Sequence, residues 1–192
     1  MKKLYPLISL IVLQSYCLPL KSQDLQFYRE DIVFQVFEDV AVIDARYYFC
    51  NLGEEDINKV IFYPFPENTI ELIDSLVIID LKTNRAISFR KSKSGVFFGI
   101  SVSGYGQAQY RVYFRQWLSG KKFKYILTST ESWGRPLEFA NFELQAPAYL
   151  TINSLSYPAD SSFIQNNVQY LFWKKKDFMP DKDFEVFFDT KR

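Results

Sequence analysis

The chain has 192 residues, of which 48% are hydrophobic and 18% aromatic, with a formal net charge of +1 and no histidine. A near-neutral balance gives no electrostatic footprint for nucleic acid. The lack of histidine excludes Ser-His and Cys-His nucleophile pairs and histidine-based zinc sites. The 19 Phe and 13 Tyr, against 7 Gly, favour strands, because aromatic side chains fit a pleated, half-buried surface.

Residues 1–22 combine a basic start with a short apolar run and predict a secretory signal peptide, since the run is too short to span a bilayer. We expect cleavage after Ser22, with cleavage after Cys17 as the alternative. A lipid anchor on Cys17 is disfavoured because the bulky Tyr16 precedes it. Removing the leader takes three lysines from 23 basic residues and leaves 20 against 22 acidic ones, in a single domain over 23–192.

The first strands are predicted over 31–38 and 40–50, from alternating apolar and polar residues. After leader removal Cys50 is the only cysteine, so no intramolecular disulfide is expected, and we interpret it as a small buried side chain. A third strand over 57–63 ends at the proline-rich corner 64–68.

Further strands are predicted in the middle of the chain. The apolar stretch 70–81 favours a strand over a short helix, since Ile and Val dominate it. A series of hairpins is predicted over 84–90, 96–102 and 108–114, with Lys, Ser and Gly in the connecting loops.

The segment 123–147 is predicted to be the centre of the fold, as a strand, a turn at 133–136 and a second strand that other strands cover. Strands over 149–157, 168–173 and 184–188 follow, with a loop over 158–167. Turn signals about every 8 to 15 residues predict an all-β fold, an antiparallel β-sandwich.

Carboxylates are the remaining source of acid-base chemistry. Glycosidase-type hydrolysis needs two of them facing one cleft. The candidates are Asp44, Asp74, Asp80, Glu138 and Glu143. Their strand positions favour solvated side chains over a catalytic pair. A calcium loop of Asp177, Asp181, Asp183 and Asp189 is disfavoured, because no glycine marks its turn. We therefore expect no metal, no cofactor and no enzyme activity.

Tryptophans and lysines offer two candidate surfaces. Trp117, Trp133 and Trp173 could stack on sugars, which makes a polysaccharide-binding module the alternative function. The lysines at 174–176 could bind anionic lipid or polysaccharide, but protection of an exposed strand edge is the favoured interpretation.

A set of packing and turn motifs resembles uncharacterised secreted β-sandwich domains of bacteria. The motifs are Tyr110-x-Val-x-Phe114, Tyr125-Ile-Leu-Thr128, Trp133-Gly-x-Pro136, Ala140-x-Phe142, the corner Tyr63-Pro-Phe-Pro66, and Trp173 followed by Phe178-Met-Pro180 and Asp183-Phe184. The resemblance implies an envelope or surface location and carries over no catalytic residue.

The favoured function is a non-enzymatic binding or structural module that is secreted, periplasmic or on the cell surface, and recognises a protein partner or envelope component. No transmembrane span is expected in the mature chain. The predicted contact residues are Trp133, Arg135, Trp117, Trp173 and Phe65. The loops around Trp133 and over 64–68 are the first choice, because loops carry function more often than strands, and Trp117 and Trp173 belong to the alternative sugar-binding function. If Trp133 lies in the contact surface, its replacement by alanine should abolish partner capture and leave the thermal transition nearly unchanged.

Overall fold

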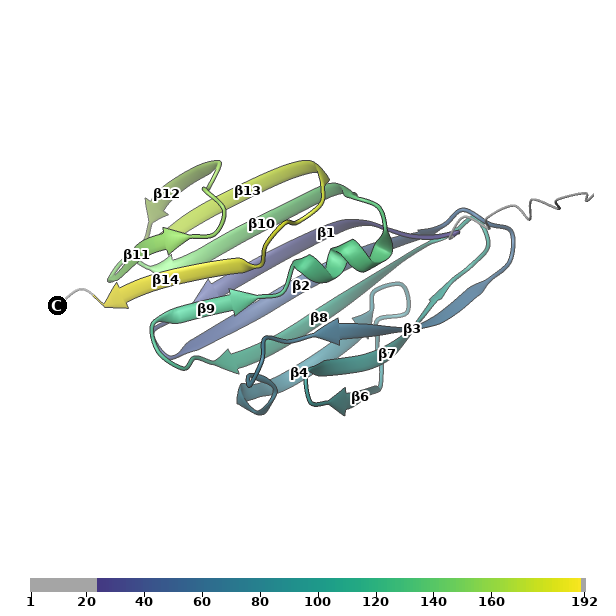
Figure 1. The fold of residues 1–192 in the computed structure, drawn as a ribbon, viewed down its shortest axis with the longest axis horizontal. Helices are drawn as coiled ribbons and strands as arrows, with labels where there is room; N and C mark the ends of the chain where they lie inside the picture. Colours follow the sequence, from purple (N-terminus) through teal and green to yellow (C-terminus); the bar gives the residue numbers. More distant parts are fainter. Residues whose placement is uncertain (1–23, 191–192) are drawn as a thin grey trace, which may run out of the picture.

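The computed structural model describes residues 24–190, which form a sandwich of one large and two small β-sheets (Figure 1). The large sheet has eight strands. In sheet order they are β12 (Ser161–Gln165), β13 (Val168–Phe178), β10 (Leu137–Pro147), β1 (Leu25–Val36), β2 (Val40–Asn51), β8 (Gln107–Trp117), β4 (Ile73–Asp80) and β5 (Arg85–Ala86).

Two three-stranded sheets cover one face of the large sheet. The first consists of β11 (Leu150–Leu155), β14 (Phe184–Thr190) and β9 (Lys122–Tyr125), and the second of β3 (Ile57–Pro64), β7 (Gly95–Val102) and β6 (Phe89–Ser92). Residues 24–190 also form two short 3-10 helices, η1 (Ile70–Leu72) and η2 (Thr128–Trp133). Helix η2 continues from β9 toward the second covering sheet (Figure 1).

Period-two alternation places one face of each long strand in the core. On β1 the side chains of Ile32, Phe34 and Val36 are buried, and their neighbours are half-buried on the outer face. The Phe34 ring packs against the ring of Phe123 on β9, with centroids 5.4 Å apart, and stacks on Phe184 of β14 at 4.6 Å. These contacts bury aromatic surface, which is the main stabilising contribution to a core of this kind.

The fold class is confirmed, but two pairings differ from the expectation. The predicted central segment is not a hairpin, because β9 is the edge strand of a covering sheet while β10 lies inside the large sheet. The connection through η2 carries the chain from one layer to the other, so β10 pairs with β1 in parallel, the one parallel pair among the described strands. The hairpin predicted from 96–102 and 108–114 is also absent, because β7 and β8 belong to different sheets.

Strand boundaries follow the sequence pattern closely in most places. The stretch 70–81 is mainly strand, as predicted, with η1 at its start. The stretch 84–90 divides between two sheets, as β5 and the first part of β6. The predicted loop 158–167 contains β12, whose five residues are all exposed and give no alternating pattern. The lysines at 174–176 lie in the part of β13 that does not pair with β12.

Other expectations concern the termini and the cysteine. The predicted signal peptide lies outside the described residues, and among residues 24–190 no helix is long and apolar enough to cross a membrane. Cys50 is half-buried rather than buried, because it lies on the outer face of β2. Its thiol contacts the Gln26 side chain at 3.6 Å, and burial raises the pKa of the thiol, which disfavours the reactive thiolate.

Candidate binding site between the covering sheets

The two covering sheets meet along a seam where β3 and β9, both edge strands, have no backbone pairing with each other among the described residues. Three tyrosine hydroxyls join the layers at this seam. The hydroxyl of Tyr63 on β3 lies 2.9 Å from that of Tyr125 on β9 and 3.1 Å from that of Tyr47 on β2, and the Tyr47 and Tyr125 hydroxyls also contact each other. Burial raises the pKa of all three phenols, so they are neutral at physiological pH.

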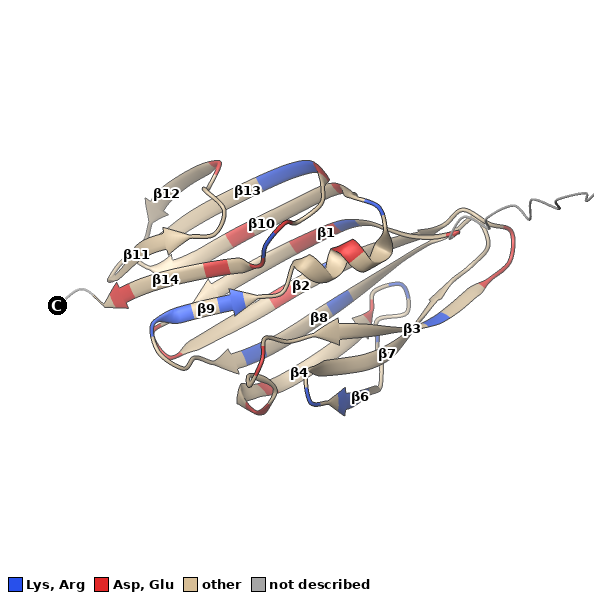
Figure 2. Ribbon diagram, viewed as in Figure 1, with Lys and Arg blue, Asp and Glu red and all other residues tan. Residues whose placement is uncertain are grey.

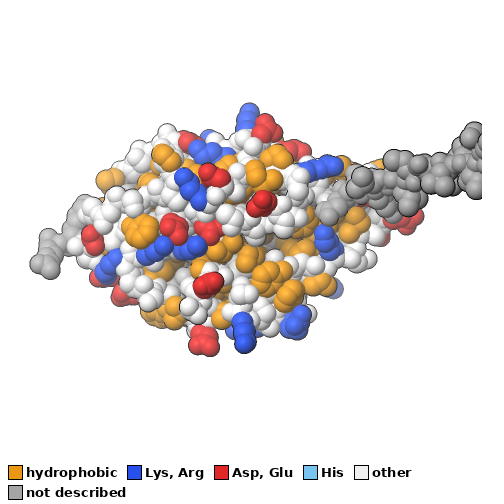
Figure 3. Space-filling model, viewed as in Figure 1, with side chains coloured by type: hydrophobic (Ala, Val, Ile, Leu, Met, Phe, Trp, Pro, Cys, Tyr) orange, Lys and Arg blue, Asp and Glu red, His pale blue; other side chains and the backbone are white. Residues whose placement is uncertain are grey.

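A groove of about 610 Å³ runs along the seam, between β3 on one side and η2 on the other. We call it the seam groove. It is lined by Lys59, Val60, Ile61, Phe62, Pro64, Ile126, Thr128, Ser129, Glu131, Ser132 and Trp133. Val60 is 66% exposed and Phe62 is 42% exposed, so two large apolar side chains on the same face of β3 meet solvent beside the groove. Figure 3 shows apolar side chains on this face of the molecule.

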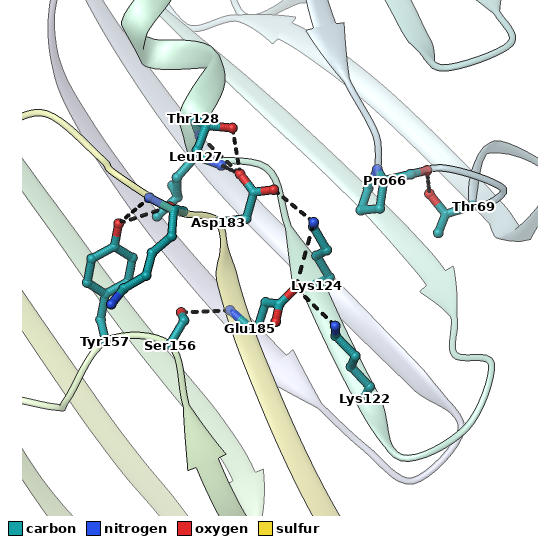
Figure 4. A network of polar contacts seen from close by, with 11 residues as sticks. Pro66, Thr69, Lys122, Lys124, Leu127, Thr128, Ser156, Tyr157, Asp183 and Glu185 are labelled. Carbon is teal, nitrogen blue, oxygen red and sulfur yellow. Dashed lines mark hydrogen bonds and ion pairs between the residues drawn. The ribbon is translucent and has the colours of Figure 1, made fainter.

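The η2 wall of the groove is anchored by Asp183, which precedes β14 (Figure 4). One oxygen of its carboxylate accepts hydrogen bonds from the backbone N–H groups of Leu127 and Thr128 and from the Thr128 hydroxyl, at 2.8 to 3.2 Å. The other oxygen pairs with Lys124 at 2.9 Å. Gly134, at φ 69°, ends the helix in a left-handed conformation that glycine tolerates best.

Beneath the groove lies a smaller cavity of about 60 Å³, which we call the inner cavity. It adjoins the groove, because both are lined by Ile61, Phe62, Pro64, Ile126, Ser129 and Trp133. The Trp133 ring packs on Phe27 and Phe49, with centroids 5.7 and 5.4 Å away, and the Lys59 ammonium lies 5.0 Å from its centroid. Trp133 therefore separates the aromatic floor of the site from the charged mouth.

The inner cavity contains a buried acid, Glu30 of β1. A bulge between Phe27 and Arg29 shifts the alternation of the strand, so both Phe27 and Glu30 point toward the core. Glu30 is 3% exposed, it lines the cavity, and its Oε1 has no hydrogen-bond partner within residues 24–190. Burial, and to a lesser degree the charge of Asp31, raises the pKa of Glu30 from 4.5 to about 8. A buried carboxyl without a partner is costly and needs an explanation.

Opposite charges stand at the mouth of the groove. Lys59 belongs to the β3 wall and Glu131 to the η2 wall. In Figure 2 the ribbon is coloured blue at a basic position of β3 and red at an acidic position of η2. An extended ligand that crosses the mouth would meet one charge of each sign.

The predicted contact residues are scattered. Trp133 alone lines the seam groove, and Arg135 is exposed in the loop that follows η2. Phe65 is a core residue, because its ring packs on Tyr63 and Phe114 with centroids 5.3 and 5.2 Å away.

The other two tryptophans lie away from the groove. Trp173 is fully buried, its ring meets Phe184 edge-on at 5.0 Å, and its indole N–H donates to the Tyr157 carbonyl. It therefore offers no exposed face for a sugar. Trp117 is 48% exposed at the end of β8, but the Arg115 guanidinium lies 5.5 Å from its ring centroid.

The candidate carboxylates do not converge on a cleft. Asp44 binds Arg111 through two hydrogen bonds of 2.7 Å, and Asp74 binds Arg115 through two of 2.8 Å, both on the outer face of the large sheet. Asp80 accepts the backbone N–H groups of a turn, Glu143 accepts from Gln145, and Glu138 is exposed.

Three of the four aspartates considered for a calcium loop have different partners. Asp181 accepts from the Tyr157 hydroxyl, Asp183 from η2, and Asp189 from Asn153. Within the described part of the chain no three acidic, cysteine or histidine side chains are grouped so that they could hold a metal ion.

Glu30 and the three tyrosines were missed by the sequence reasoning. Tyr47, Tyr63 and Tyr125 each lay on a predicted strand, but nothing in the sequence pairs residues so far apart. For Glu30 a signal was present, because it lies two residues before Ile32 and so continues the buried row of Ile32, Phe34 and Val36. A carboxyl group in a buried row is a reason to look for a site.

Comparison with solved structures finds the same fold in other proteins. A protein of Legionella pneumophila, provisionally described as nutrient-binding, matches with a TM-score of 0.71 at 10% identity, over 88% of this chain and 68% of that one. An M1 zinc metallopeptidase of Deinococcus radiodurans, bound to the substrate Tyr-Ser-Ala, matches with a TM-score of 0.52 at 9% identity, over 86% of this chain and 43% of the peptidase. The chain thus spans less than half of the peptidase's length.

At these identities the likeness shows the fold alone. No protein-family model matches the sequence, and no curated protein is significantly similar to it. The resemblance to secreted β-sandwich domains is therefore confirmed only to the level of an all-β domain.

Proposed function

We propose that the chain is a non-enzymatic binding module that captures an extended peptide segment of a protein partner in the seam groove. The observation that carries this proposal is the position of β3. It is an edge strand, and its free edge forms one wall of a groove whose other wall is η2.

An edge strand has a row of backbone N–H and C=O groups that can pair with another chain. Natural proteins cover or charge such an edge, and Lys59 is one exposed charge on β3, but Val60 and Phe62 are also exposed beside it. A peptide that adds to β3 would pair with its backbone and bury these two side chains. The strand has eight residues, so it offers about 26 Å of edge, enough for a peptide of about eight residues.

The other groups of the groove suit the same occupant. Lys59 and Glu131 can meet polar or charged side chains of the peptide, and Trp133 gives an aromatic surface at the centre of the site. The similarity to a protein provisionally described as nutrient-binding is compatible with a binding role. The glycan alternative has less support, because Trp173 is buried and a cation lies against a face of both Trp117 and Trp133.

Binding of a library of random nine-residue peptides to the mature protein tests the proposal. We expect enrichment of peptides with alternating apolar residues, and at least a tenfold loss of affinity in Val60→Asp, which places a charge in the groove. Val77→Asp is the matched control, since Val77 is exposed on β4 away from the groove. Equal binding by both variants, or no enriched peptide, would contradict the proposal.

We also propose that the module is exported to the cell envelope, on the basis of the predicted signal peptide in residues 1–22. The mass of the mature N-terminus, measured after cell fractionation, tests this part separately. Cleavage after Ser22 or Cys17 with the protein in an envelope or extracellular fraction is the expected result. An uncleaved chain in the cytoplasm would contradict it.

A further inference from the structure

Several groups around the inner cavity can accept hydrogen bonds, and the Glu30 carboxyl can do so through both oxygens once it has released its proton. Tyr47, Tyr63 and Tyr125 each contact the other two hydroxyls, so a closed ring of hydrogen bonds uses all three phenol protons. Each oxygen keeps a second lone pair. The buried Oε1 of Glu30 lines the same cavity without a partner in the described chain. A ligand group that brings hydrogen-bond donors would satisfy the unpartnered Glu30 oxygen and the free lone pairs of the tyrosines.

The walls of the cavity favour a cationic donor. The rings of Phe27, Phe49 and Trp133 pack against one another around it, and aromatic faces attract cations in desolvated sites. An uncharged donor would leave the carboxyl without a counter-charge, whereas a cation stabilises its ionised form.

The size of the cavity favours one of the two cationic groups that are common in peptides, the ammonium and the guanidinium. A space of about 60 Å³ suits a compact ammonium group with three donors better than a planar guanidinium with five donors in a wide fork. The cavity adjoins the groove, so a side chain of a peptide on β3 could reach it.

The geometry points to a specificity pocket for a primary ammonium group, which binds Glu30 and the tyrosine hydroxyls and belongs to the peptide that occupies the seam groove. Its source is either a lysine side chain or a free N-terminus. The assignment to a peptide rests on the proposed function, whereas the ammonium pocket can be tested alone.

Two kinds of probe test the peptide assignment and the ammonium pocket separately. The first is the random nine-residue library, prepared with free and with acetylated N-termini, followed by replacement of each enriched lysine by norleucine or arginine. The second is n-butylammonium chloride, with butan-1-ol as its uncharged counterpart. Each is measured on the mature protein and on Glu30→Gln, with Glu138→Gln as a matched control because Glu138 is exposed on β10.

We expect lysine peptides to bind at least tenfold more tightly than their norleucine versions, and Glu30→Gln to remove this difference while norleucine peptides still bind. Selection of free N-termini instead of lysine would support the pocket and identify the other source. The norleucine and butanol comparisons use unaltered protein, so they remain decisive even if Glu30→Gln fails to fold.

Other results would overturn one proposal or both. Peptide binding without any ammonium preference, unchanged in Glu30→Gln, would overturn the ammonium pocket and leave the groove. Glu30-dependent binding of butylammonium without any peptide binding would support the pocket and overturn the peptide function. Binding of neither probe would overturn both.

Discussion

The hydroxyl of Tyr63 on β3 lies 2.9 Å from the hydroxyl of Tyr125 on β9, and this contact bridges two sheets that share no backbone pairing within the described chain. The Tyr47 hydroxyl connects both to the large sheet. The seam is thus joined by side chains, and a substitution that removes one hydroxyl oxygen can weaken it.

Tyr63→Phe should lower the free energy of unfolding by about 1 to 3 kcal/mol, because it removes one hydroxyl that contacts two buried partners. Urea unfolding measures this loss. Tyr149→Phe, at an exposed position, is the control and should have no measurable effect. Equal stability of both variants would mean that the hydroxyl contacts do not stabilise the seam.

Glu30→Gln should change the pH dependence of stability. The pKa of Glu30 rises on folding from 4.5 to about 8, so below about pH 4.5, where the carboxyl is protonated in both states, its ionisation does not affect stability. Between pH 4.5 and 8 the Glu30 carboxyl is ionised in the unfolded state and still protonated in the folded state. The free energy of unfolding therefore falls by a total on the order of 5 kcal/mol as pH rises through this range.

The groups that face Glu30 do not titrate in this window. Burial raises the pKa of Tyr47, Tyr63 and Tyr125. For Asp31 burial tends to raise the pKa, but hydrogen bonds from its neighbours outweigh it and leave the value lowered. Urea unfolding between pH 5 and 9 should give a flatter profile for Glu30→Gln than for the wild type. Parallel profiles would contradict the burial of an ionisable carboxyl.

Asp183→Ala should loosen η2, since it removes three hydrogen bonds to Leu127 and Thr128 and an ion pair with Lys124. We expect faster amide hydrogen exchange over 127–133 and a stability loss of about 1 to 2 kcal/mol, similar to loss of a helix cap. Asp39→Ala, in an exposed turn, is the control. Unchanged exchange in η2 would contradict the anchoring role.

Trp133→Ala should lower stability by about 2 kcal/mol, because the half-buried ring packs on Phe27 and Phe49. This differs from the sequence-based expectation of a nearly unchanged thermal transition. Calorimetry of this variant beside Trp117→Ala, whose side chain is about half exposed and packs on no aromatic ring of residues 24–190, measures the difference. If both variants unfold at the wild-type temperature, Trp133 does not stabilise the fold through these contacts.

The sequence predicts those parts of the fold that depend on local pattern. Alternation located the long strands, as in 96–102, where Val96, Phe98, Ile100 and Val102 are buried as expected. It failed where a strand lies exposed on both faces, as in β12, and where a polar run such as 128–133 forms a short helix. Sheet membership could not be predicted, because alternation says which residues are buried but not against which layer.

The candidate site was only partly predictable for a related reason. Trp133 was recognised from its turn context, but its partners come from β1, β2 and β3, which the fold brings together over long sequence distances. The bulge near Tyr28 also hid the extension of β1 beyond Glu30 to Leu25, because it breaks the alternation of the strand. Buried hydroxyl clusters leave no local pattern, since each tyrosine alone resembles an ordinary core residue.

The parallel pairing of β1 with β10 also constrains when the protein can fold. Gln35 and Gln145 bond across this pair at 2.9 Å, although 110 positions separate them. One edge of β1 thus has no native partner until most of the chain has been synthesised. Folding dominated by such distant contacts is slow, and the incomplete chain exposes an unpaired edge to aggregation. We therefore expect the nascent chain to depend on chaperones until β10 is available.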